Sequence, residues 1–397
     1  MVPVLHSQIK IWAENQRGAI AAETVQALAL NDSPQALLLV DHMSRKFKFR
    51  QIKNAAGAAL QNTASLLGIS REELEDRLVP DLGFDSKMEQ MFDYGSRKFT
   101  VRLNQALEME IYDGNGKRLK NMPAPGKQDD PEKAASSNQA FKQMKKQLKE
   151  TITSQKLRLE QALSVARFWE ADRWKALFVQ NPVMHLFAEG LIWGIYEGQE
   201  CRGAFRYMED GTFNTVEEEE FVLPETGKIG LVHPLELTAE DLKAWKEQLA
   251  DYEIVQPFDQ LGRPVCKATK EEQESLPVSR FADATLNGLT LSGRLLGMGW
   301  FRGEILDAGF FENYYRNDGA FGAELVFSGS SVGYEYDEVT IKELYFYRLS
   351  PEDAKSSAHR AFENGSRCLP GEVPGRYFSE VLLQVAKAVG EQVQNLD

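Results

Sequence analysis

The sequence predicts an α+β fold. Helical patterns alternate with short hairpin patterns, regular strand–helix–strand spacing is missing, and glycine-punctuated aromatic strands gather towards the C-terminus. Such a mixture is typical of α+β proteins rather than of doubly wound sheets. A chain of 397 residues is also too long for one ordinary domain. We expect a helical segment at 1–82, an α+β body at 83–282, and an aromatic-rich β meander with terminal helices at 283–397.

Residues 1–82 are predicted to be helical. Residues 34–67 carry two apolar stripes at helical spacing, joined by a basic elbow, and Ser70 with Glu73 forms a capping box for another short helix. The two stripes resemble one helical hairpin of the HEAT type, which we expect to pack on the mixed body. Helical repeats need about three or more neighbours to bury their faces. We therefore expect the chain to be the C-terminal part of a larger protein or a short member of a longer family, and the incomplete repeat should leave apolar surface exposed.

The body is expected to open with strands and then to form one long helix at 131–169. Two alternating runs at 98–103 and 107–112 are followed by the turn sequence Asp113-Gly114-Asn115-Gly116. Asp130-Pro131-Glu132 is typical of a helix start. An apolar stripe runs along the helix: Phe141, Met144, Leu148, Ile152, Leu159, Ala162, Val165 and Trp169. Lysines occupy much of the remaining surface: Lys142, Lys145, Lys146, Lys149 and Lys156.

The remaining elements are predicted from alternation, caps and turns. The expected order is a hairpin at 203–223, a strand at 228–232, a helix at 238–250, a strand at 252–255, a helix at 287–298, strands from 300 to 347, a helix opening at Ser350-Pro351, and a last helix at 377–393.

Several segments together resemble a known family. They are LEDRLVPDLGFD (74–85), DYGSRKFTVRLN (93–104), IGLVHPLEL (229–237), DYEIVQPFDQLGRPV (251–265), GWFRGEILDAGFF (299–311) and VPGRYFSEVLLQV (373–385). In this order they resemble the domain of unknown function of bacterial MolR-like proteins, over nearly the whole chain from about Pro34.

The resemblance implies helical repeats upstream in longer relatives, and in some relatives a WGR module associated with nucleic-acid binding. Trp193-Gly194-Ile195 departs from that module's signature, because isoleucine stands where arginine is expected. The family carries a name linked to molybdate metabolism, but it offers no catalytic residues to transfer, and no molybdenum-ligand pattern is present in this sequence.

Composition limits the compartment and the partners. Cys201, Cys266 and Cys368 lie far apart, which argues against a disulfide framework or a thiolate zinc site and favours the cytoplasm. The net charge of −13 disfavours non-specific binding to nucleic acid or anionic membranes. No apolar run approaches the roughly 20 residues that cross a bilayer, and no secretory signal is predicted.

Known reactive motifs are missing or out of context. Gly329-Ser330-Ser331-Val332-Gly333 satisfies G-x-S-x-G, but the following residues are predicted to be strand rather than helix, so we interpret it as a hairpin turn. The glycine-rich segment at 297–303 has the wrong spacing for a dinucleotide loop, and no phosphate-binding loop is present. The five histidines do not pair at metal-binding spacing. We predict neither a cofactor nor a metal site.

One polar cluster remains as a candidate site. His233 and Glu236 follow one predicted strand end, and Gln256, Asp259 and Arg263 follow another. If the two ends converge in one cleft, a histidine and a carboxylate are suited to proton transfer. The simpler interpretation is that the prolines at 234 and 257 terminate strands and that His233 caps the next helical segment.

Three hypotheses for function follow. We expect a binding or regulatory module of a bacterial cytoplasmic protein, acting through a protein partner or through missing upstream repeats. An enzyme of unknown class, using His233, Glu236, Asp259 and Arg263, is the first alternative. The second is nucleic-acid binding through the lysine face, for which Lys142, Lys145 and Lys149 are the candidates; a lysine stripe is more simply a solvated face.

Overall fold

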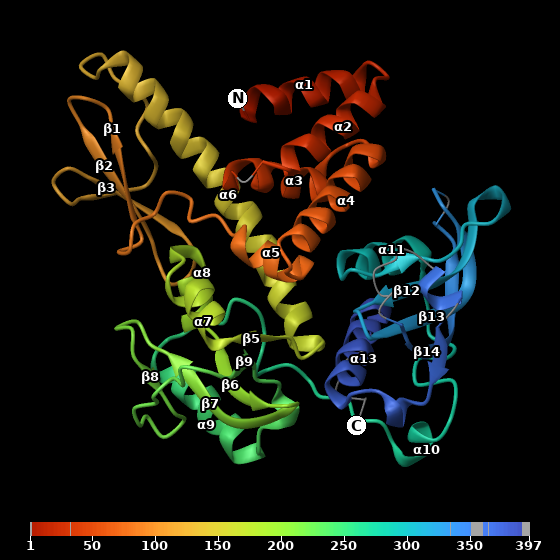
Figure 1. The fold of residues 1–397 in the computed structure, drawn as a ribbon. Helices are drawn as coiled ribbons and strands as arrows, with labels where there is room; N and C mark the ends of the chain where they lie inside the picture. Colours follow the sequence, from red (N-terminus) through yellow and green to blue (C-terminus); the bar gives the residue numbers. More distant parts are fainter. Residues whose placement is uncertain (1, 32, 334, 351–359, 364, 391–397) are drawn as a thin grey trace. The chain divides into compact units, whose positions relative to one another are not determined.

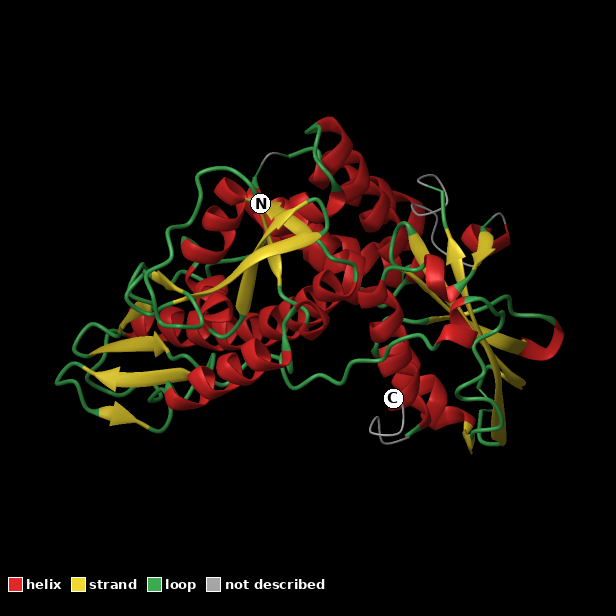
Figure 2. Ribbon diagram, turned by 90° about the horizontal axis from the view of Figure 1, so that it is seen from below, coloured by secondary structure: helices red, strands yellow, loops and turns green. Residues whose placement is uncertain are grey.

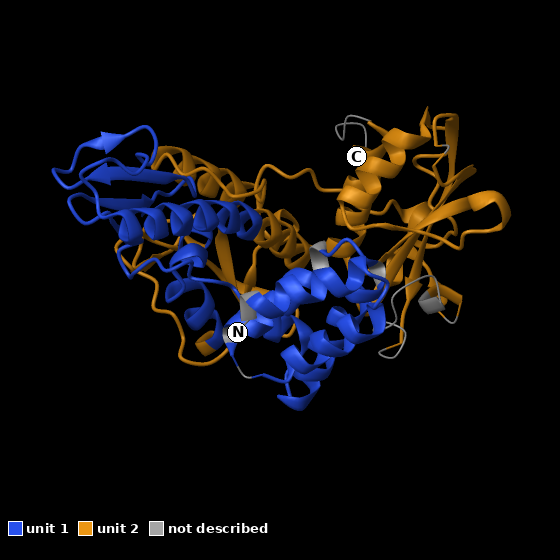
Figure 3. Cartoon of the chain, turned by 90° about the horizontal axis from the view of Figure 1, so that it is seen from above, with its two compact units in different colours: residues 1–152, 173–187 blue, residues 153–172, 188–397 orange. Residues whose placement is uncertain are grey.

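The computed structural model describes residues 2–31, 33–333, 335–350, 360–363 and 365–390. Within these residues the fold is α+β, as the sequence predicts, with helices beside antiparallel sheets (Figures 1 and 2). The chain divides into two compact units: residues 1–152 with 173–187, and residues 153–172 with 188–397 (Figure 3). The expected boundary at 82/83 falls inside the first unit, and the one at 282/283 falls inside the second.

The first unit begins with a series of helices. They are α1 (Val2–Glu14), α2 (Gly18–Ala29), α3 (Pro34–Lys46), α4 (Arg50–Leu66) and α5 (Arg71–Arg77). Their apolar stripes meet in one core that includes Ile9, Val25 and Val40. The Ser70–Glu73 capping box is present, with bonds of 3.1 and 2.9 Å. The helical prediction for this segment is confirmed, while its likeness to HEAT repeats stays a prediction.

A four-stranded antiparallel sheet follows. Its strands are β1 (Glu89–Asp93), β2 (Lys98–Leu103), β3 (Met109–Asp113) and β4 (Arg118–Leu119), hydrogen-bonded in that order. The sheet packs on the start of α6 (Pro131–Ser164), where Phe92 meets Phe141 edge to face and Ser137 Oγ donates to the carbonyl of Asp93 at 2.8 Å. The predicted strands and their turn are confirmed.

Helix α6 is amphipathic but shorter than predicted. The Asp130 carboxylate accepts the backbone N–H groups of residues 132 and 133, so the helix begins at the predicted proline. It ends at Ser164 instead of 169, because Ala166 adopts a positive φ of 51° and Trp169 enters strand β5 (Phe168–Glu170). A buried tryptophan fits the apolar stripe of a helix and the inner face of a strand equally well. The predicted helix was therefore extended past its true end to Trp169. Helices α7 (Ala171–Trp174) and α8 (Pro182–Glu189) follow, separated by the π-helical turn η1 (Lys175–Val179).

A five-stranded antiparallel sheet forms the first part of the second unit. Its order is β5-β9-β6-β7-β8, with β6 (Ile192–Glu197), β7 (Glu200–Tyr207), β8 (Phe213–Asn214) and β9 (Lys228–Leu231). The short helix η2 (Pro234–Glu236) and α9 (Ala239–Asp251) follow β9. The strand predicted at 252–255 is wrong: Tyr252 and Ile254 donate their N–H groups back to the carbonyls of Gln248 and Leu249 at the end of α9.

A six-stranded antiparallel sheet completes the unit. Its strands are β10 (Thr285–Asn287), β11 (Phe301–Arg302), β12 (Phe310–Asn317), β13 (Phe321–Ser331), β14 (Glu338–Arg348) and β15 (Ser366–Cys368). The accompanying helical segments are α10 (Lys270–Gln273), α11 (Gly288–Gly297), η3 (Asp307–Gly309), α12 (Arg360–Glu363), η5 (Pro370–Glu372) and α13 (Gly375–Val389).

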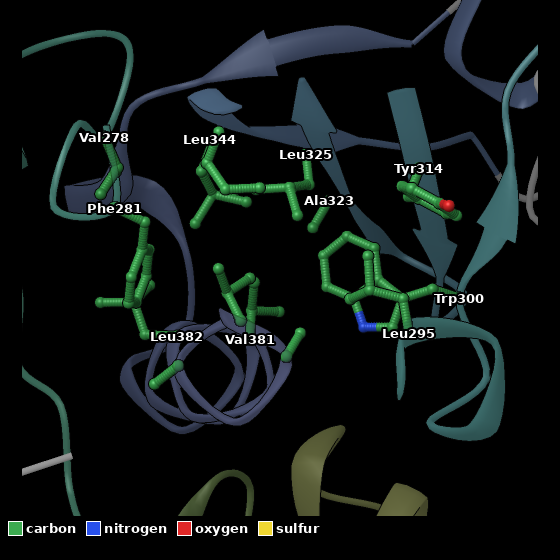
Figure 4. Close-up of a cluster of buried hydrophobic side chains, with 14 of the residues drawn as sticks. Val278, Phe281, Leu295, Trp300, Tyr314, Ala323, Leu325, Leu344, Val381 and Leu382 are labelled. Atoms are coloured by element: carbon green, nitrogen blue, oxygen red, sulfur yellow. The ribbon is translucent and has the colours of Figure 1, made fainter. Parts of the chain in front are cut away.

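Helix α13 packs against this sheet and contributes apolar side chains to the shared core. Val381 and Leu382 belong to one buried cluster with Ala323, Leu325 and Leu344 of the strands (Figure 4). The predicted meander and the helix at 287–298 are confirmed, the latter as α11. The helix predicted to open at Ser350-Pro351 lies largely outside the described residues, as do the last three residues of the helix predicted at 377–393.

Candidate functional site

His233 lies where β9 ends and the proline at 234 begins η2. Its side chain is fully buried. The ring Nδ1 accepts the backbone N–H of Leu235 at 3.1 Å, and Nε2 lies 3.1 Å from Oε1 of Glu380. Because Nδ1 is an acceptor, the ring proton is assigned to Nε2, which donates it to the carboxylate. Both ring nitrogens of His233 are therefore engaged.

Glu380, on α13, is the centre of the cluster. Its side chain is only 2% exposed. Oε1 accepts the hydrogen bond from Nε2–H of His233, while Oε2 pairs with Nη1 of Arg263 and accepts a hydrogen bond from Ser164 Oγ at 3.3 Å. The sequence reasoning did not select this residue. The available signal was a glutamate within the nearly continuous apolar surface of the final helix, where a charge requires a partner.

Arg263 extends the cluster to α6. Its side chain is buried, and Nη2 lies 2.9 Å from Oε1 of Glu160. Its Nε–H donates to the backbone carbonyl of Asp259 at 2.9 Å. The structure thus brings His233 and Arg263 together on opposite oxygens of one buried carboxylate, although the second strand end from which their convergence was argued is not a strand.

A second ion pair adjoins the first. Glu236 accepts the backbone N–H of His233 at 2.8 Å and the hydroxyl of Tyr196 at 2.8 Å through Oε2, while Oε1 pairs with Arg376 of α13. Arg376 also donates to the Tyr196 hydroxyl at 3.0 Å and to the backbone carbonyls of Leu163 and Leu231. Glu236 is therefore a capping and ion-pairing residue.

Burial and pairing fix the protonation states. Burial lowers the pKa of His233, against the opposing effect of Glu380, so the ring is neutral. Burial by itself would raise the pKa of Glu380, but the hydrogen bonds and charges of His233 and Arg263 outweigh it and the pKa is lowered. For Arg376, the effect of burial is likewise outweighed by Tyr196 and Glu236, and its pKa is raised.

Gln256 and Asp259 have different surroundings. The Gln256 side chain donates to the carbonyl of Gly190 and to the Gln260 side chain, and accepts the N–H of Leu261 at 3.1 Å. Fully buried Gln260 bridges β6 and β9 through the carbonyls of residues 192 and 232. The Asp259 side chain is exposed, and only its backbone carbonyl contacts Arg263.

The cluster joins four segments: β9 with η2, the end of α6, the segment at 256–263, and α13. A general base needs a lone pair within hydrogen-bond reach of the substrate proton. His233 has its Nδ1 lone pair occupied by a backbone N–H and is closed to solvent. The geometry therefore favours a buried scaffold, and the enzyme hypothesis stays a prediction without support from this arrangement.

The lysine face of α6 is solvent-exposed at Lys142, Lys145 and Lys149, opposite the buried Phe141, Met144 and Leu148. Exposure of these lysines fits both a solvated face and a nucleic-acid-binding face, so both interpretations stay predictions. Within the described residues, no group of three or more His, Cys, Asp or Glu side chains is placed to hold a metal ion. In the same residues, no helix is both long and apolar enough to cross a membrane.

Ser331 ends strand β13 and is followed by the turn at 332–333 and by β14 (Glu338–Arg348). Gly329 has a positive φ of 97°, and the aromatic ring of Phe310 approaches it too closely for a Cβ. The hairpin interpretation is confirmed, and the helix that a nucleophile elbow requires is missing from the described residues of this connection.

Comparison with known proteins finds similarity without an activity. Residues 116–300 match the family described as a domain of unknown function, DUF4132. The chain is 34% identical over 350 residues to "Uncharacterized protein YehI" of Escherichia coli (strain K12). That match covers 87% of this chain and 28% of the relative, so the chain spans less than a third of the relative's length. No solved structure matches significantly.

Proposed function

We propose that the chain is a binding module of a bacterial cytoplasmic protein and that it acts through protein contacts on the outer face of α1 and α2. The observation that carries the proposal is exposed apolar surface on these two helices. Val4 is 70% exposed, and Ile11 and Ile20 are each 47% exposed. Contiguous apolar side chains on a surface mark sites of association.

The helix pair is apolar on two sides. Val4 and Ile11 are seven residues apart, which places them on one face of α1. Only three residues connect α1 to α2, so Ile11 and Ile20 lie at the same end of the pair. The opposite side contributes Ile9 and Val25 to the helical core. A helix pair with apolar residues on both sides resembles an inner layer of a stack, which is covered by a neighbour on each side.

The occupant we propose is an amphipathic helical hairpin of a partner protein. It would repeat the packing that α3 and α4 already make on the other side of α1 and α2, where helices pack side against side through apolar residues. The resemblance to MolR-like proteins, whose longer members carry helical repeats, supports this choice. So does the length of the relative, of which the matched region is 28%.

Site-specific photo-crosslinking in bacterial cells tests the proposal. A photoreactive amino acid at Ile11 should form an adduct with a helical protein, and the same group at Val222, which is 80% exposed in the other unit, should not. A Val4→Lys substitution should abolish the adduct from position 11, because an ammonium group cannot be buried unpaired against an apolar surface.

Two results would contradict the proposal. Equal adducts from positions 11 and 222 would show random collision. An adduct joining two copies of this chain, with a dimer mass in light scattering, would replace the partner protein by a second copy.

A further inference from the structure

A second exposed apolar surface lies at one end of the six-stranded sheet. It includes no residue of α1 or α2, on which the proposed function rests. Three connections meet there because their strands are antiparallel neighbours: β10 to α11, β11 to β12, and β13 to β14. Register pairs place Phe310 opposite Ser331 and Asn287 opposite Glu338, so the start of β12, the end of β13 and the start of β14 share this end.

Hydrogen bonds order these connections and join neighbouring ones. The N–H of Val332 donates to the carbonyl of Gly309 at 2.9 Å, and Gly309 donates to Leu306 at 3.1 Å. On the other side, the Asn287 side chain donates to the carbonyl of Tyr336 at 2.8 Å. The three connections are therefore neighbours at this end of the sheet.

Five large apolar side chains of these loops are between 40% and 70% exposed. They are Leu289, Ile305, Leu306, Val332 and Tyr336. Together with the exposed carboxylates described in the next paragraph, they make up what we call the sheet-end surface. Single exposed apolar residues need no explanation, but five on neighbouring loops form a patch of the kind that marks association. Tyrosine in particular is frequent among residues that dominate binding energy.

Carboxylates surround these side chains. Glu304, Asp307, Asp337 and Glu338 are all exposed. Residues 303–312 and 328–338 contain neither lysine nor arginine. The nearby Arg302 is already neutralised, since its guanidinium pairs with Glu335 and donates to Ser292 Oγ at 2.7 Å. The charged side chains of these two segments are thus all carboxylates.

We propose that the sheet-end surface binds a basic amphipathic segment of a protein, in which apolar side chains cover Val332 and Tyr336 and flanking lysines or arginines face the carboxylates. Opposite charges around an apolar centre accelerate encounter and set the orientation of the partner. An acidic partner or an anionic membrane would instead meet repulsion from the same carboxylates.

Fluorescence anisotropy with a labelled probe peptide tests this inference on the full chain. The probe has about 18 residues of leucine and lysine at helical spacing, or five turns. A control peptide of the same composition has its leucines spread around the helix. We expect the amphipathic probe to bind at least about tenfold more tightly than the control peptide, because only the probe presents an apolar face.

Matched variants separate this surface from the general negative charge of the chain. Val332→Ser with Tyr336→Ser should weaken probe binding about tenfold or more, whereas Val222→Ser with Val255→Ser, at two positions elsewhere that are more exposed still, should not. Asp337→Asn with Glu338→Gln should weaken binding and reduce its salt dependence more than Glu217→Gln with Glu219→Gln, which removes the same charge from another exposed loop. Unchanged unfolding midpoints would show that all four variants are folded.

Three outcomes would overturn the inference: equal losses in the sheet-end and control variants, equal binding of the two peptides, or no binding of the probe at low salt. The proposed binding on the outer face of α1 and α2 would stand in each case, because its crosslinking test involves other residues.

Discussion

The Glu380 cluster and the outer face of α1 and α2 are opposites in what they bury and what they expose. Around Glu380, charged side chains are buried and held by neighbouring charges and backbone groups. On α1, apolar side chains such as Ile11 face solvent. Polar residues after predicted strand ends were the candidates for a functional site, yet in the structure the residues of this cluster hold segments of the chain together. The apolar residues without cover are the better indication of where another molecule binds.

The largest expected effect concerns the carboxylate of Glu380. A Glu380→Ala substitution leaves Arg263 without its buried partner and His233 without an acceptor, which should reduce the free energy of unfolding by about 3–5 kcal/mol. Urea denaturation measures the change. Glu160→Gln is the control, because the Glu160 side chain is 36% exposed and the loss of its ion pair should cost about 1 kcal/mol or less. Near-equal losses for the two variants would mean that the cluster does not support the fold.

A smaller effect should appear in the pH dependence of stability. The pKa of His233 is lowered by burial from its ordinary value of 6.5, so below that pH the unfolded chain binds a proton that the folded chain does not. The contribution is complete above pH 6.5 and is lost as the pH falls, by at most about 1.4 kcal/mol per pH unit for one group. Glu380 acts only at lower pH, because its pKa lies below 4.5.

His233→Gln isolates this contribution. The pKa of His6 is also lowered, first by burial, and it remains in the variant, so the slope of stability between pH 7 and 5.5 should decrease without vanishing. Urea denaturation at several pH values gives the slope. An unchanged slope would show that His233 is already protonated in the folded protein or exposed to water.

The local chemistry of the cluster could be predicted, but its partners could not. The proline at 234 after a strand end indicates that His233 caps the next helical segment, and the structure has that cap. Glu380 pairs with His233 across 147 residues of sequence, and no local pattern specifies which strand end a distant helix meets. The same limit applies to α6, where Trp169 continues a helical stripe although its burial comes from a strand. Local periodicity determines the type of an element, whereas tertiary pairing determines where it ends and which charges meet.

The hydroxyl of Tyr196 should contribute less than the charges it touches. It lies within hydrogen-bond distance of Glu236 and Arg376, at 2.8 and 3.0 Å, so Tyr196→Phe should cost about 1–2 kcal/mol while the ion pair itself remains. Chemical denaturation measures this loss. A loss as large as that of Glu380→Ala would make the hydroxyl, and not the two carboxylates, the principal organiser of the cluster.

The smallest expected change in stability is for a substitution on α1. It tests the exposed apolar face in the comparison with the buried Glu380 cluster. Ile9 and Ile11 are two residues apart, but Ile9 is buried in the helical core and Ile11 faces solvent. Ile9→Ala should cost about 2–5 kcal/mol because it leaves a cavity. Ile11→Lys should change the free energy of unfolding by no more than about 0.5 kcal/mol, since Ile11 is 47% exposed and a lysine there can extend its ammonium group into solvent. If Ile11→Lys instead destabilises the chain as much as Ile9→Ala, the outer face of α1 is covered within the chain itself, and the apolar surface on which the proposed binding depends does not exist.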